Sequence, residues 1–414
     1  MTLSFDIALT HLRNRKRQTL VSVLGVAMGV GFFIAMAAMM QGFQHYFVAK
    51  VIDVWPHIVV KDEYRSAPLQ PAQRLFSGGA VALHGLKPLE ELRGIKDAKT
   101  IVAELDGRPG MAAAPTLRGQ VFLRYGGKDV SATLVGIEPQ HERRVSHLES
   151  DLITGRLNAL YSTANGIILG EGVAKKAGVG MHDTLSVISP AGVILKMKVV
   201  GIFRTGITPI DNFESYALLK KAQILQNRPN VINQIRIRLQ DVNQAGATAR
   251  GIEARLGYRT EAWEETYENV LGIFVIQNGI MYSTVSAILI VAAFGIFNII
   301  STVVHEKTRD IAILKSVGFE QGDIRTIFLL EGMVVGLVGT LLGWLLGYSL
   351  TRLLGTIRFH IEGFVTAQGF FLYYSYMHYL IASSFAVLSA MFAAWLPARK
   401  AARLNPVDII RGAA

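Results

Sequence analysis

The sequence predicts a membrane protein with four transmembrane α-helices and a large extracytoplasmic α+β domain inserted between helices 1 and 2. Its 414 residues are 51% hydrophobic and 18% charged, with a mean hydropathy of +0.35, which is unusual for a soluble globular protein. The apolar residues gather in long runs at 20–40, 271–303, 326–350 and 379–396, and about 20 such residues span a bilayer as a helix. Residues 57–269 instead carry charges and short β-type runs.

Basic residues predict the orientation of the spans. The formal net charge is +11, and short flanks rich in Lys and Arg stay in the cytoplasm. Three basic clusters lie on one side of the membrane only if there are four spans: Arg13, Arg15, Lys16 and Arg17; Lys307, Arg309, Lys315 and Arg325; Arg399, Lys400, Arg403 and Arg411. We therefore expect a multi-pass membrane protein with cytoplasmic N- and C-termini and a central domain on the outer side of the membrane.

The chain divides into nine expected segments. They are a cytoplasmic or interfacial N-terminal helix (1–19), transmembrane helix 1 with a stalk (20–56), the extracytoplasmic α+β domain (57–269), transmembrane helix 2 (270–304), a cytoplasmic coupling helix (305–325), transmembrane helix 3 (326–350), an extracytoplasmic connection (351–378), transmembrane helix 4 (379–397, ending at Pro397) and a cytoplasmic tail (398–414). The N-terminal segment is equally consistent with a helix on the membrane surface and with the first turns of span one.

Small residues in the spans predict close helix packing. Gly25, Gly29 and Ala37 recur at multiples of four residues in span one, and span three has glycines at 332, 336, 339, 343 and 347. Such spacing lets two helices approach closely. Glu331 is an ionisable group near the inner end of span three. A structural role with a Lys or Arg partner at the interface is the favoured interpretation, and a proton relay is the alternative.

The sequence of the central domain predicts short strands and helices. Expected strands are 57–61, 100–105, 120–124, 129–136, 166–169, 184–189, 193–203 and 232–239, and expected helices are 87–92, 172–177, 218–226 and 243–256. Pro190, Ala191 and Gly192 would join two strands as a hairpin.

A polar segment, residues 304–325, separates the second and third apolar runs. Ile311, Ala312 and Leu314 alternate with charges at helical spacing, Gly318 is placed to end the helix, and Gly322 and Asp323 precede the next one. This pattern predicts a short amphipathic helix between two spanning helices, through which a separate ATP-driven subunit would move both.

Several chemistries have no support in the sequence. There is no cysteine, no G-x-x-x-x-G-K-[ST] nucleotide loop and no H-E-x-x-H or G-x-S-x-G motif. His141, Glu142 and His147 lack the spacing of a helical zinc pair. No nucleic-acid-binding pattern is present. We expect a permease subunit that catalyses nothing alone and binds no metal or cofactor.

Two segments carry a family resemblance. The motif FNIIST (297–302) followed by HEKTRDIAILKSVGFEQGDIRTIFLLEG, and the tail AAWLPARKAARLNPVDIIRG, resemble the permeases of the lipoprotein-releasing and macrolide-exporter (MacB-like, FtsX-like) type of ABC transporter. Gln41-Gly42-Phe43 and Trp55-Pro56-His57 are similar to the lipoprotein-releasing branch in particular. GRLN and GIILGEGVAKKAGVGMHDTLSVIS resemble the family's periplasmic segment.

The resemblance implies an inner-membrane location, with residues 57–269 and 351–378 on the periplasmic side, and a mechanism called mechanotransmission. Two permeases, identical or paralogous, would pair on a cytoplasmic ABC ATPase dimer that uses ATP and Mg, and closure of that dimer would move the periplasmic domains. In lipoprotein-releasing systems one permease has a protruding hairpin that recruits a periplasmic carrier. Residues 187–199 show no such insertion, which fits the partner permease or a relative with another substrate.

These expectations define two sets of site residues. The ATPase-coupling set is Glu306, Lys307, Arg309, Asp310, Ile311, Leu314, Lys315 and Gly318. The substrate-cavity set, at the outer membrane edge, is Met36, Met39, Met40, Phe43, Phe274 and Met281, because methionine and aromatic side chains adapt to varied apolar chains. Plain helix packing explains the second set equally well.

Three functions remain open. The first is extraction of lipoprotein or lipid-like substrate from the outer leaflet. The second is efflux of drugs or peptides with a periplasmic adaptor and an outer-membrane duct. The third is regulation, without transport, of a cell-wall hydrolase or a sensor kinase.

Overall fold

The computed structural model describes residues 2–63, 94–359, 361–362, 366–367 and 369–405. The chain forms two compact units. The helical unit comprises Met1–Tyr46, Gly272–Phe359 and Gln368–Ala414, and the β unit comprises Phe47–Leu271 and His360–Ala367. The predicted helix at 87–92, and Phe364 in the predicted periplasmic connection, lie outside the described residues.

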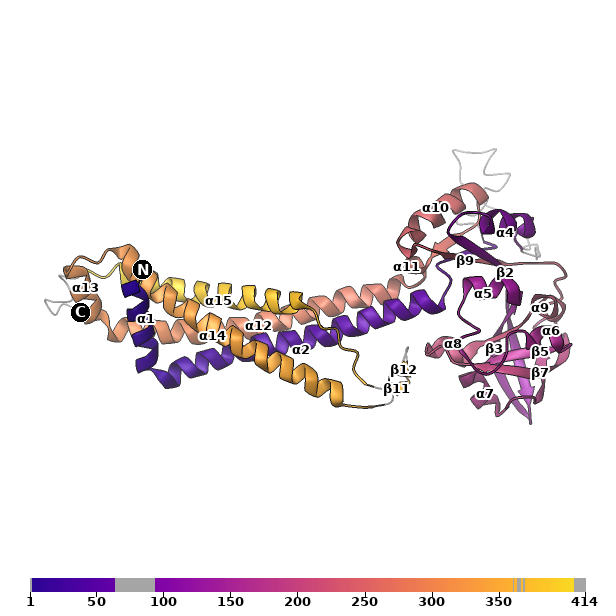
Figure 1. Cartoon of the computed structure of the whole chain (residues 1–414), viewed down its shortest axis with the longest axis horizontal. Coiled ribbons are helices and arrows are strands. Elements are labelled where there is room, and N and C mark those ends of the chain that lie inside the picture. Colours follow the sequence, from indigo (N-terminus) through magenta and orange to yellow (C-terminus); the bar gives the residue numbers. More distant parts are fainter. Residues whose placement is uncertain (1, 64–93, 360, 363–365, 368, 406–414) are drawn as a thin grey trace, which may run out of the picture. The chain divides into compact units, whose positions relative to one another are not determined.

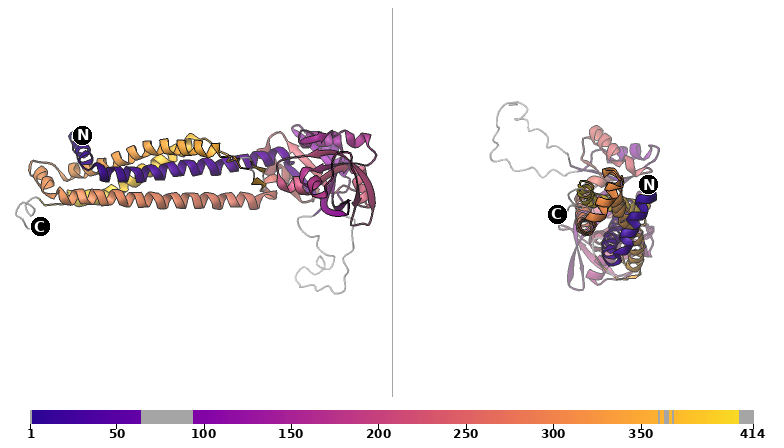
Figure 2. Two further views of the ribbon diagram at one scale, coloured as in Figure 1. Left: turned by 90° about the horizontal axis from the view of Figure 1, so that it is seen from below. Right: turned by 90° about the vertical axis from the view of Figure 1, so that its left-hand side faces the viewer.

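The helical unit is a bundle of long helices. Its helices are α1 (Thr2–Asn14), α2 (Lys16–Val54), α12 (Glu268–Glu306), α13 (Thr308–Ser316), α14 (Gln321–Thr356) and α15 (Tyr376–Ala402). Among the described residues four helices, α2, α12, α14 and α15, are long and apolar enough to cross a membrane, in agreement with the four predicted spans. Figures 1 and 2 show α2, α12, α14 and α15 side by side, with α1 and α13 at one end of the bundle.

The glycines of α14 pack against two different helices. A Cβ atom on Gly332 would lie 2.6 Å from the Cβ of Ala394 on α15, whereas one on Gly343 would lie 2.6 Å from the Cβ of Val30 on α2. Such distances leave no room for a side chain, so glycine permits both contacts. The prediction of close packing at these positions is confirmed.

The end of α15 differs from the prediction. The helix does not stop at Pro397 but continues to Ala402. Proline removes one backbone donor, a loss that neighbouring helices in a bundle can offset. The side chains of the last turns are small and buried: Ala393, Ala394, Pro397, Ala398, Ala401 and Ala402. Their packing against the bundle keeps the helix intact past the proline.

The N-terminal segment forms its own helix. α1 ends at Asn14, Arg15 is a turn residue, and α2 begins at Lys16. Ala8 of α1 is fully buried in the core of the bundle. Of the two predicted alternatives, a separate helix rather than the first turns of α2 is therefore present.

The β unit contains one large sheet of ten strands. Its order is β10-β1-β9-β2-β3-β8-β5-β7-β4, and β6 pairs with β2 and β7. The strands are β1 (Ile58–Lys61), β2 (Met111–Tyr125), β3 (Lys128–Ile137), β4 (Leu152–Gly155), β5 (Gly166–Gly170), β6 (Thr184–Ile188), β7 (Ile194–Phe203), β8 (Glu214–Leu218), β9 (Gln234–Leu239) and β10 (Thr260–Ala262). Two short strands, β11 (Ile361–Glu362) and β12 (Thr366–Ala367), form a separate sheet.

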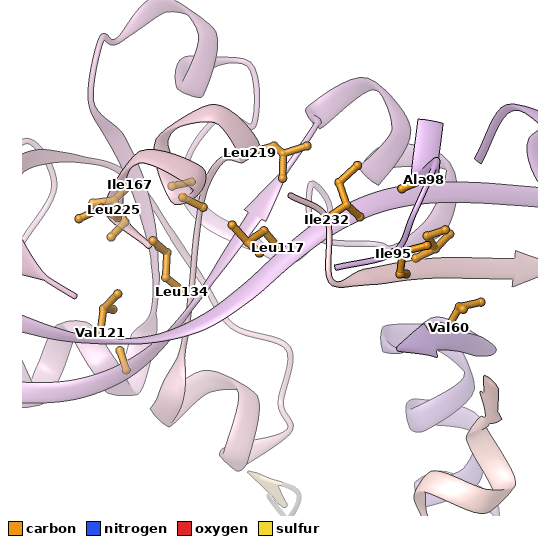
Figure 3. Close-up of a cluster of buried hydrophobic side chains, with 14 of the residues drawn as sticks. Val60, Ile95, Ala98, Leu117, Val121, Leu134, Ile167, Leu219, Leu225 and Ile232 are labelled. Atoms are coloured by element: carbon orange, nitrogen blue, oxygen red, sulfur yellow. The ribbon is translucent and has the colours of Figure 1, made fainter. Parts of the chain in front are cut away.

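Short helices complete the β unit. They are α4 (Ala98–Asp106), α5 (Pro139–Val145), α6 (Ala159–Ser162), α7 (Glu171–Ala177), α8 (Thr208–Phe213), α9 (Leu219–Leu225), the 3-10 turn η1 (Val242–Gln244), α10 (Ala245–Leu256) and α11 (Trp263–Thr266). Figure 3 shows side chains of the main core, among them Leu117, Leu134, Ile167 and Leu225, gathered between sheet and helices.

The long strand β2 joins two parts of the sheet. It pairs antiparallel with β9 from Met111 to Thr116, and with β3 from Leu117 to Tyr125. Only residues 120–124 of this strand were expected, because the alanine-rich first half lacks the β-branched residues typical of strands. Beyond it, β8 is parallel to β3 and antiparallel to β5.

One predicted strand is wrong. Residues 100–105 lie in the helix α4, where Ala98, Val102 and Leu105 are buried. Their spacing of three and four residues places them on one face of a helix, so burial of that face decides the structure. The tight hairpin after residue 189 is confirmed: Gly192 has φ +79° and donates its N–H to the carbonyl of Ser189 at 3.0 Å.

Candidate coupling site on helix α13

Helix α13 is a separate short helix with defined ends. Gly318 follows it with φ +110°, a conformation that favours glycine. The N–H of Gly318 donates to the carbonyl of Lys315 at 3.2 Å, and that of Phe319 to the carbonyl of Leu314 at 3.1 Å. Glu320 and Asp323 then form a capping box that starts α14. The predicted stop at Gly318 and the predicted lead-in at Asp323 are confirmed.

One face of α13 is anchored in the bundle. Ile311 and Ala312 are 3% and 0% exposed and belong to the core of the helical unit, against which Leu314 and Phe319 also pack. Burying Ile311 fully stabilises the contact by about 1.5–3 kcal/mol. Ile311 and Leu314 of the predicted coupling set therefore hold the helix to its own bundle.

The other face of α13 is exposed and carries apolar side chains. Ile313 is 51% exposed, and Val317, the residue directly after the last residue of α13, is 77% exposed. Arg309, Asp310 and Gly318 are also exposed. Neither Ile313 nor Val317 belongs to the predicted coupling set. Ile313 and Val317 are four residues apart, so they lie on the same side of the helix, away from the buried Ile311 and Ala312. This spacing in the sequence could have predicted the second apolar surface.

Four of the five charged residues of the predicted set, Glu306, Lys307, Asp310 and Lys315, have partners within the bundle. The Nζ of Lys307 donates to the Oδ2 of Asp310 at 2.7 Å, and Arg15 forms an ion pair with Glu306. The Nζ of Lys315 donates to the carbonyl oxygens of Ala402 at 3.0 Å and Leu404 at 2.6 Å. A cation at the C-terminal end of a helix satisfies free carbonyl groups there. Lys315 thus joins α13 to the end of α15.

A further polar contact lies at this end of the bundle. The Nδ1 of His11 on α1 is 2.6 Å from the Oε1 of Glu331 on α14, and Glu331 is 1% exposed. The expected structural role fits this geometry, but the partner is a histidine rather than a lysine or arginine. α1 is therefore attached to the bundle by a buried polar contact.

The six residues of the predicted substrate cavity lie on α2 and α12. Met281 is fully buried in the core of the bundle, Met40 belongs to the same core cluster, and Met36 is partly buried against that cluster. Phe274 is buried, and its ring meets that of Phe43 edge-on with centroids 6.0 Å apart. Met39 is partly exposed. Within one copy of the chain these contacts are those of helix packing, and the role in a substrate cavity stays a prediction.

Neighbouring aromatic residues fix the segment that precedes α15. The rings of Tyr46 and Phe371 stack with centroids 3.7 Å apart, and the N–H of Tyr373 donates to the carbonyl of Ala38 at 2.9 Å. A Cβ atom on Gly42 would lie 2.2 Å from the carbonyl oxygen of Phe371. This segment was expected as a membrane-interface belt, but its described residues include side chains that pack against α2.

The cluster of His141, Glu142 and His147 does not converge. His147 pairs with Asp53 at 2.8 Å, and Glu142 pairs with Arg236 at 3.1 Å. In the described part of the chain, no group of three or more His, Asp or Glu residues is placed to hold a metal ion.

The geometry describes a membrane protein whose helices are joined, at one end of the bundle, through a short amphipathic helix. Sequence comparison defines the class. Residues 19–255 match the MacB-like periplasmic core domain, and residues 282–406 match the FtsX-like permease C-terminal family. The chain therefore belongs to the MacB-like and FtsX-like family of ABC transporter permeases.

Relatives span almost the whole chain. It is 27% identical to the lipoprotein-releasing system transmembrane protein LolC of Xylella fastidiosa, over 99% of this chain and 98% of that protein. It is 24% identical to the macrolide export ATP-binding/permease protein MacB of a Shewanella species, over 98% of this chain but 60% of that protein. The crystal structure of the periplasmic region of MacB from Actinobacillus actinomycetemcomitans aligns with 51% of this chain and 91% of that one, at 14% identity and a TM-score of 0.32.

Together, the apolar helices and the MacB-like core domain indicate an inner-membrane protein. Its relatives are permease components of ABC transporters, which work with a cytoplasmic ATPase.

Proposed function

We propose that this chain is a permease subunit that couples ATP hydrolysis by a separate cytoplasmic ATPase dimer to the extraction of a lipoprotein or another lipid-like substrate. The substrate leaves the outer leaflet of the inner membrane. Both termini are cytoplasmic, the β unit is periplasmic, and a second permease, a copy or a paralogue, completes the complex. ATP and Mg bind the ATPase and not this chain.

The observation that carries the proposal is the two-faced structure of α13. Its buried face, with Ile311 and Ala312, fixes it to the bundle, while Ile313 and Val317 are exposed beside Arg309 and Asp310. Exposed apolar residues with charged neighbours are typical of a protein contact surface. A partner that binds this face moves α12 and α14, because α13 lies between them in the chain.

The long helices support transmission of that movement. α2 and α12 each have 39 residues, which gives a length of about 58 Å at 1.5 Å per residue. This is roughly twice the ~30 Å hydrocarbon thickness. Each helix therefore extends beyond the membrane, and packed helices shift as units rather than bend gradually.

Two observations favour a lipid-like substrate. The similarity to LolC, whose name assigns it to a lipoprotein-releasing system, extends over 99% of this chain. In addition, Met36, Met39, Met40, Phe43, Phe274 and Met281 concentrate adaptable apolar side chains on α2 and α12. We propose that these residues contact the substrate when a second permease closes the site.

Reconstitution tests this function. Proteoliposomes with the permease and its ATPase are loaded with a triacylated fluorescent reporter protein or with its unacylated form, and ATP-dependent release into solution is measured. We expect release of the acylated reporter alone. Val317→Asp should abolish release by placing a charge in the ATPase contact, whereas Ile194→Asp, at a 60% exposed position of the β unit, should leave it unchanged. No release of the acylated reporter would contradict the proposal.

Macrolide export is the second candidate, and it is favoured by the match of residues 19–255 to the MacB-like core domain. The same proteoliposomes, assayed with a radiolabelled macrolide and a periplasmic adaptor, distinguish the two. Macrolide transport without reporter release would establish this alternative.

A further inference from the structure

Helix α2 ends inside the β unit, and its last carbonyl groups find partners there. The last four carbonyls of an α-helix have no acceptor role within the helix itself. The carbonyl of Ile52 accepts a hydrogen bond from the Nε2 of His57 at 3.2 Å. The carbonyl of Asp53 accepts one from the Nη1 of Arg238, on strand β9, at 3.2 Å. A cation is also favoured at this end by the helix dipole, so side chains of the β unit cap α2.

The imidazole ring of His57 also holds strand β9. Its Nδ1 accepts a hydrogen bond from the backbone N–H of Leu239 at 3.1 Å. Because a backbone N–H only donates and a carbonyl only accepts, the ring is neutral and carries its proton on Nε2. His57 is 4% exposed, so water competes little for either bond. A ring turned over would present carbon atoms to both partners, and this one orientation therefore links α2 to β9.

The connection from α2 to strand β1 is short and stiff. It consists of Trp55, Pro56 and His57. Proline has a fixed φ and disfavours helical geometry at the residue before it, so the helix stops here and the connection has little freedom. Strand β1 lies between β9 and β10 in the sheet. The end of α2 therefore leads directly into an interior strand.

The same histidine contacts the segment that leads to α12. Its backbone carbonyl accepts a hydrogen bond from the N–H of Trp263, the first residue of α11, at 3.0 Å, and α12 begins soon after at Glu268. The ring of Tyr267, which is 8% exposed, meets that of Phe47 on α2 edge-on with centroids 6.1 Å apart. The end of α2 and the approach to α12 are thus joined within the β unit.

We propose that His57 and Arg238 are positioning residues that form a rigid joint between the end of α2 and strand β9, and that movement of α2 passes through this joint into the β unit. The inference rests on the proposed function, in which movement at α13 reaches the long helices, and it assigns the next step. A helix whose end is capped by side chains of a strand turns or shifts only if that strand moves with it or the bonds break.

Spin labels within the β unit test the joint without the ATPase. The chain has no cysteine, so Ala49→Cys, at an exposed position of α2, and Ile194→Cys, on β7, introduce one pair of labels. Electron paramagnetic resonance on the full-length permease in nanodiscs gives the distribution of distances between them. We expect a narrow distribution in this parent and a broader one after His57→Phe, which removes both hydrogen bonds of the ring.

Conservative variants separate the two bonds of the ring. His57→Asn keeps an acceptor near the position of Nδ1 for the N–H of Leu239, and His57→Gln keeps a donor near the position of Nε2 for the carbonyl of Ile52. Each should broaden the distribution less than His57→Phe does. His182→Asn is the matched control, because His182 is an exposed residue of the same unit, and it should equal the parent. If thermal unfolding shows that His57→Phe does not fold, the asparagine and glutamine variants decide.

Release of the acylated reporter per ATP hydrolysed distinguishes transmission from a contribution to stability alone. His57→Phe should lower this ratio about threefold or more, the factor that corresponds to the net loss of one hydrogen bond, while ATP hydrolysis continues. Arg238→Met, which removes the donor to the carbonyl of Asp53, should lower it in the same way. His57→Asn and His57→Gln should give intermediate ratios, and His182→Asn the wild-type ratio.

Two results would overturn the proposal. One is an unchanged distance distribution in all folded His57 variants, and the other is an unchanged release per ATP in the variants that broaden the distribution. Absence of release by the wild-type protein would instead contradict the proposed function, and the distance distributions would then decide the joint by themselves.

Discussion

Lys315 of α13 donates a hydrogen bond to the backbone carbonyl of Ala402, the last residue of α15, at 3.0 Å. A second bond from the same ammonium group reaches the carbonyl of Leu404 at 2.6 Å. Because α13 is also continuous with the connections to α12 and α14, one short helix touches or joins three of the four long helices. A displacement of α13 is therefore shared among them.

Removing the hydrogen bonds from Lys315 to the end of α15 should uncouple transport from ATP hydrolysis. Lys315→Met keeps the length of the side chain but loses both hydrogen bonds, a change of about 1–3 kcal/mol for bonds from a charged donor. We expect ATP-driven release in proteoliposomes to fall while ATP hydrolysis by the complex continues. Lys400→Met is the matched control, since Lys400 is exposed near the end of α15. Equal release by Lys315→Met and wild-type protein would show that this contact does not transmit movement.

Gly343 should be sensitive to the smallest side chain. Gly343→Ala places a Cβ 2.6 Å from that of Val30, and overpacking of this kind costs about 1–3 kcal/mol. Unfolding of the purified permease by SDS titration measures the loss. Gly279→Ala on α12 is the control, because no atom lies within 4 Å of the added Cβ, and it should be neutral or slightly stabilising. Equal stability of the two variants would show that Gly343 is not tightly packed against Val30.

His11 and Glu331 should show strong coupling in a double-mutant cycle. His11→Ala leaves the buried carboxyl group of Glu331 without the partner that lies 2.6 Å away, at a cost of about 1–3 kcal/mol. In a Glu331→Ala background the same change should cost much less, and thermal unfolding of the four proteins gives the difference. Thr10→Ala, at an exposed position on the same helix, should have little effect in either background. Additive effects of the two substitutions would exclude a direct interaction.

Glu171 should make the β unit sensitive to acid. Its hydrogen bonds with Arg204 lower the pKa of the Glu171 carboxyl group from 4.5 to about 2. A carboxyl group whose pKa is lower in the folded state stabilises it above the unfolded pKa, and this contribution is lost as the pH falls from about 5 towards 2. Urea unfolding at pH 5.5 and pH 3 should show a smaller acid-induced loss for Glu171→Gln than for the wild type. An identical loss in both proteins would contradict the assignment.

Hydropathy and glycine spacing were sufficient to predict the bundle. The apolar runs became α2, α12, α14 and α15, and Gly318 ends α13 as expected. These features are local in sequence, since helix length, periodicity and a positive φ depend on neighbouring residues. In the β unit, α10 and the hairpin between β6 and β7 were predicted for the same reason.

Contacts between distant residues could not be predicted. His11 and Glu331 are 320 residues apart, and the pairing of Lys315 with Ala402 depends on α15 continuing through Pro397. The strand β8 was missed because Glu214 and Ser215 are polar yet buried, so it lacks an apolar pattern. Residues 100–105 were wrongly predicted as a strand. A short apolar run fits both the two-residue period of a strand and the roughly 3.6-residue period of a helix until its packing partners are known.

Chemical crosslinking from α13 tests the central claim most directly. The chain has no cysteine, so Val317→Cys and Ile194→Cys each introduce one site for a maleimide-linked photocrosslinker, at the C-terminal end of α13 and on the β unit. In membranes that contain the ATPase, we predict that Val317→Cys crosslinks to the ATPase in a nucleotide-dependent manner and that Ile194→Cys does not. Crosslinking of the ATPase from Ile194→Cys, or reaction of Val317→Cys only with reagents applied from the periplasmic side, would contradict the account.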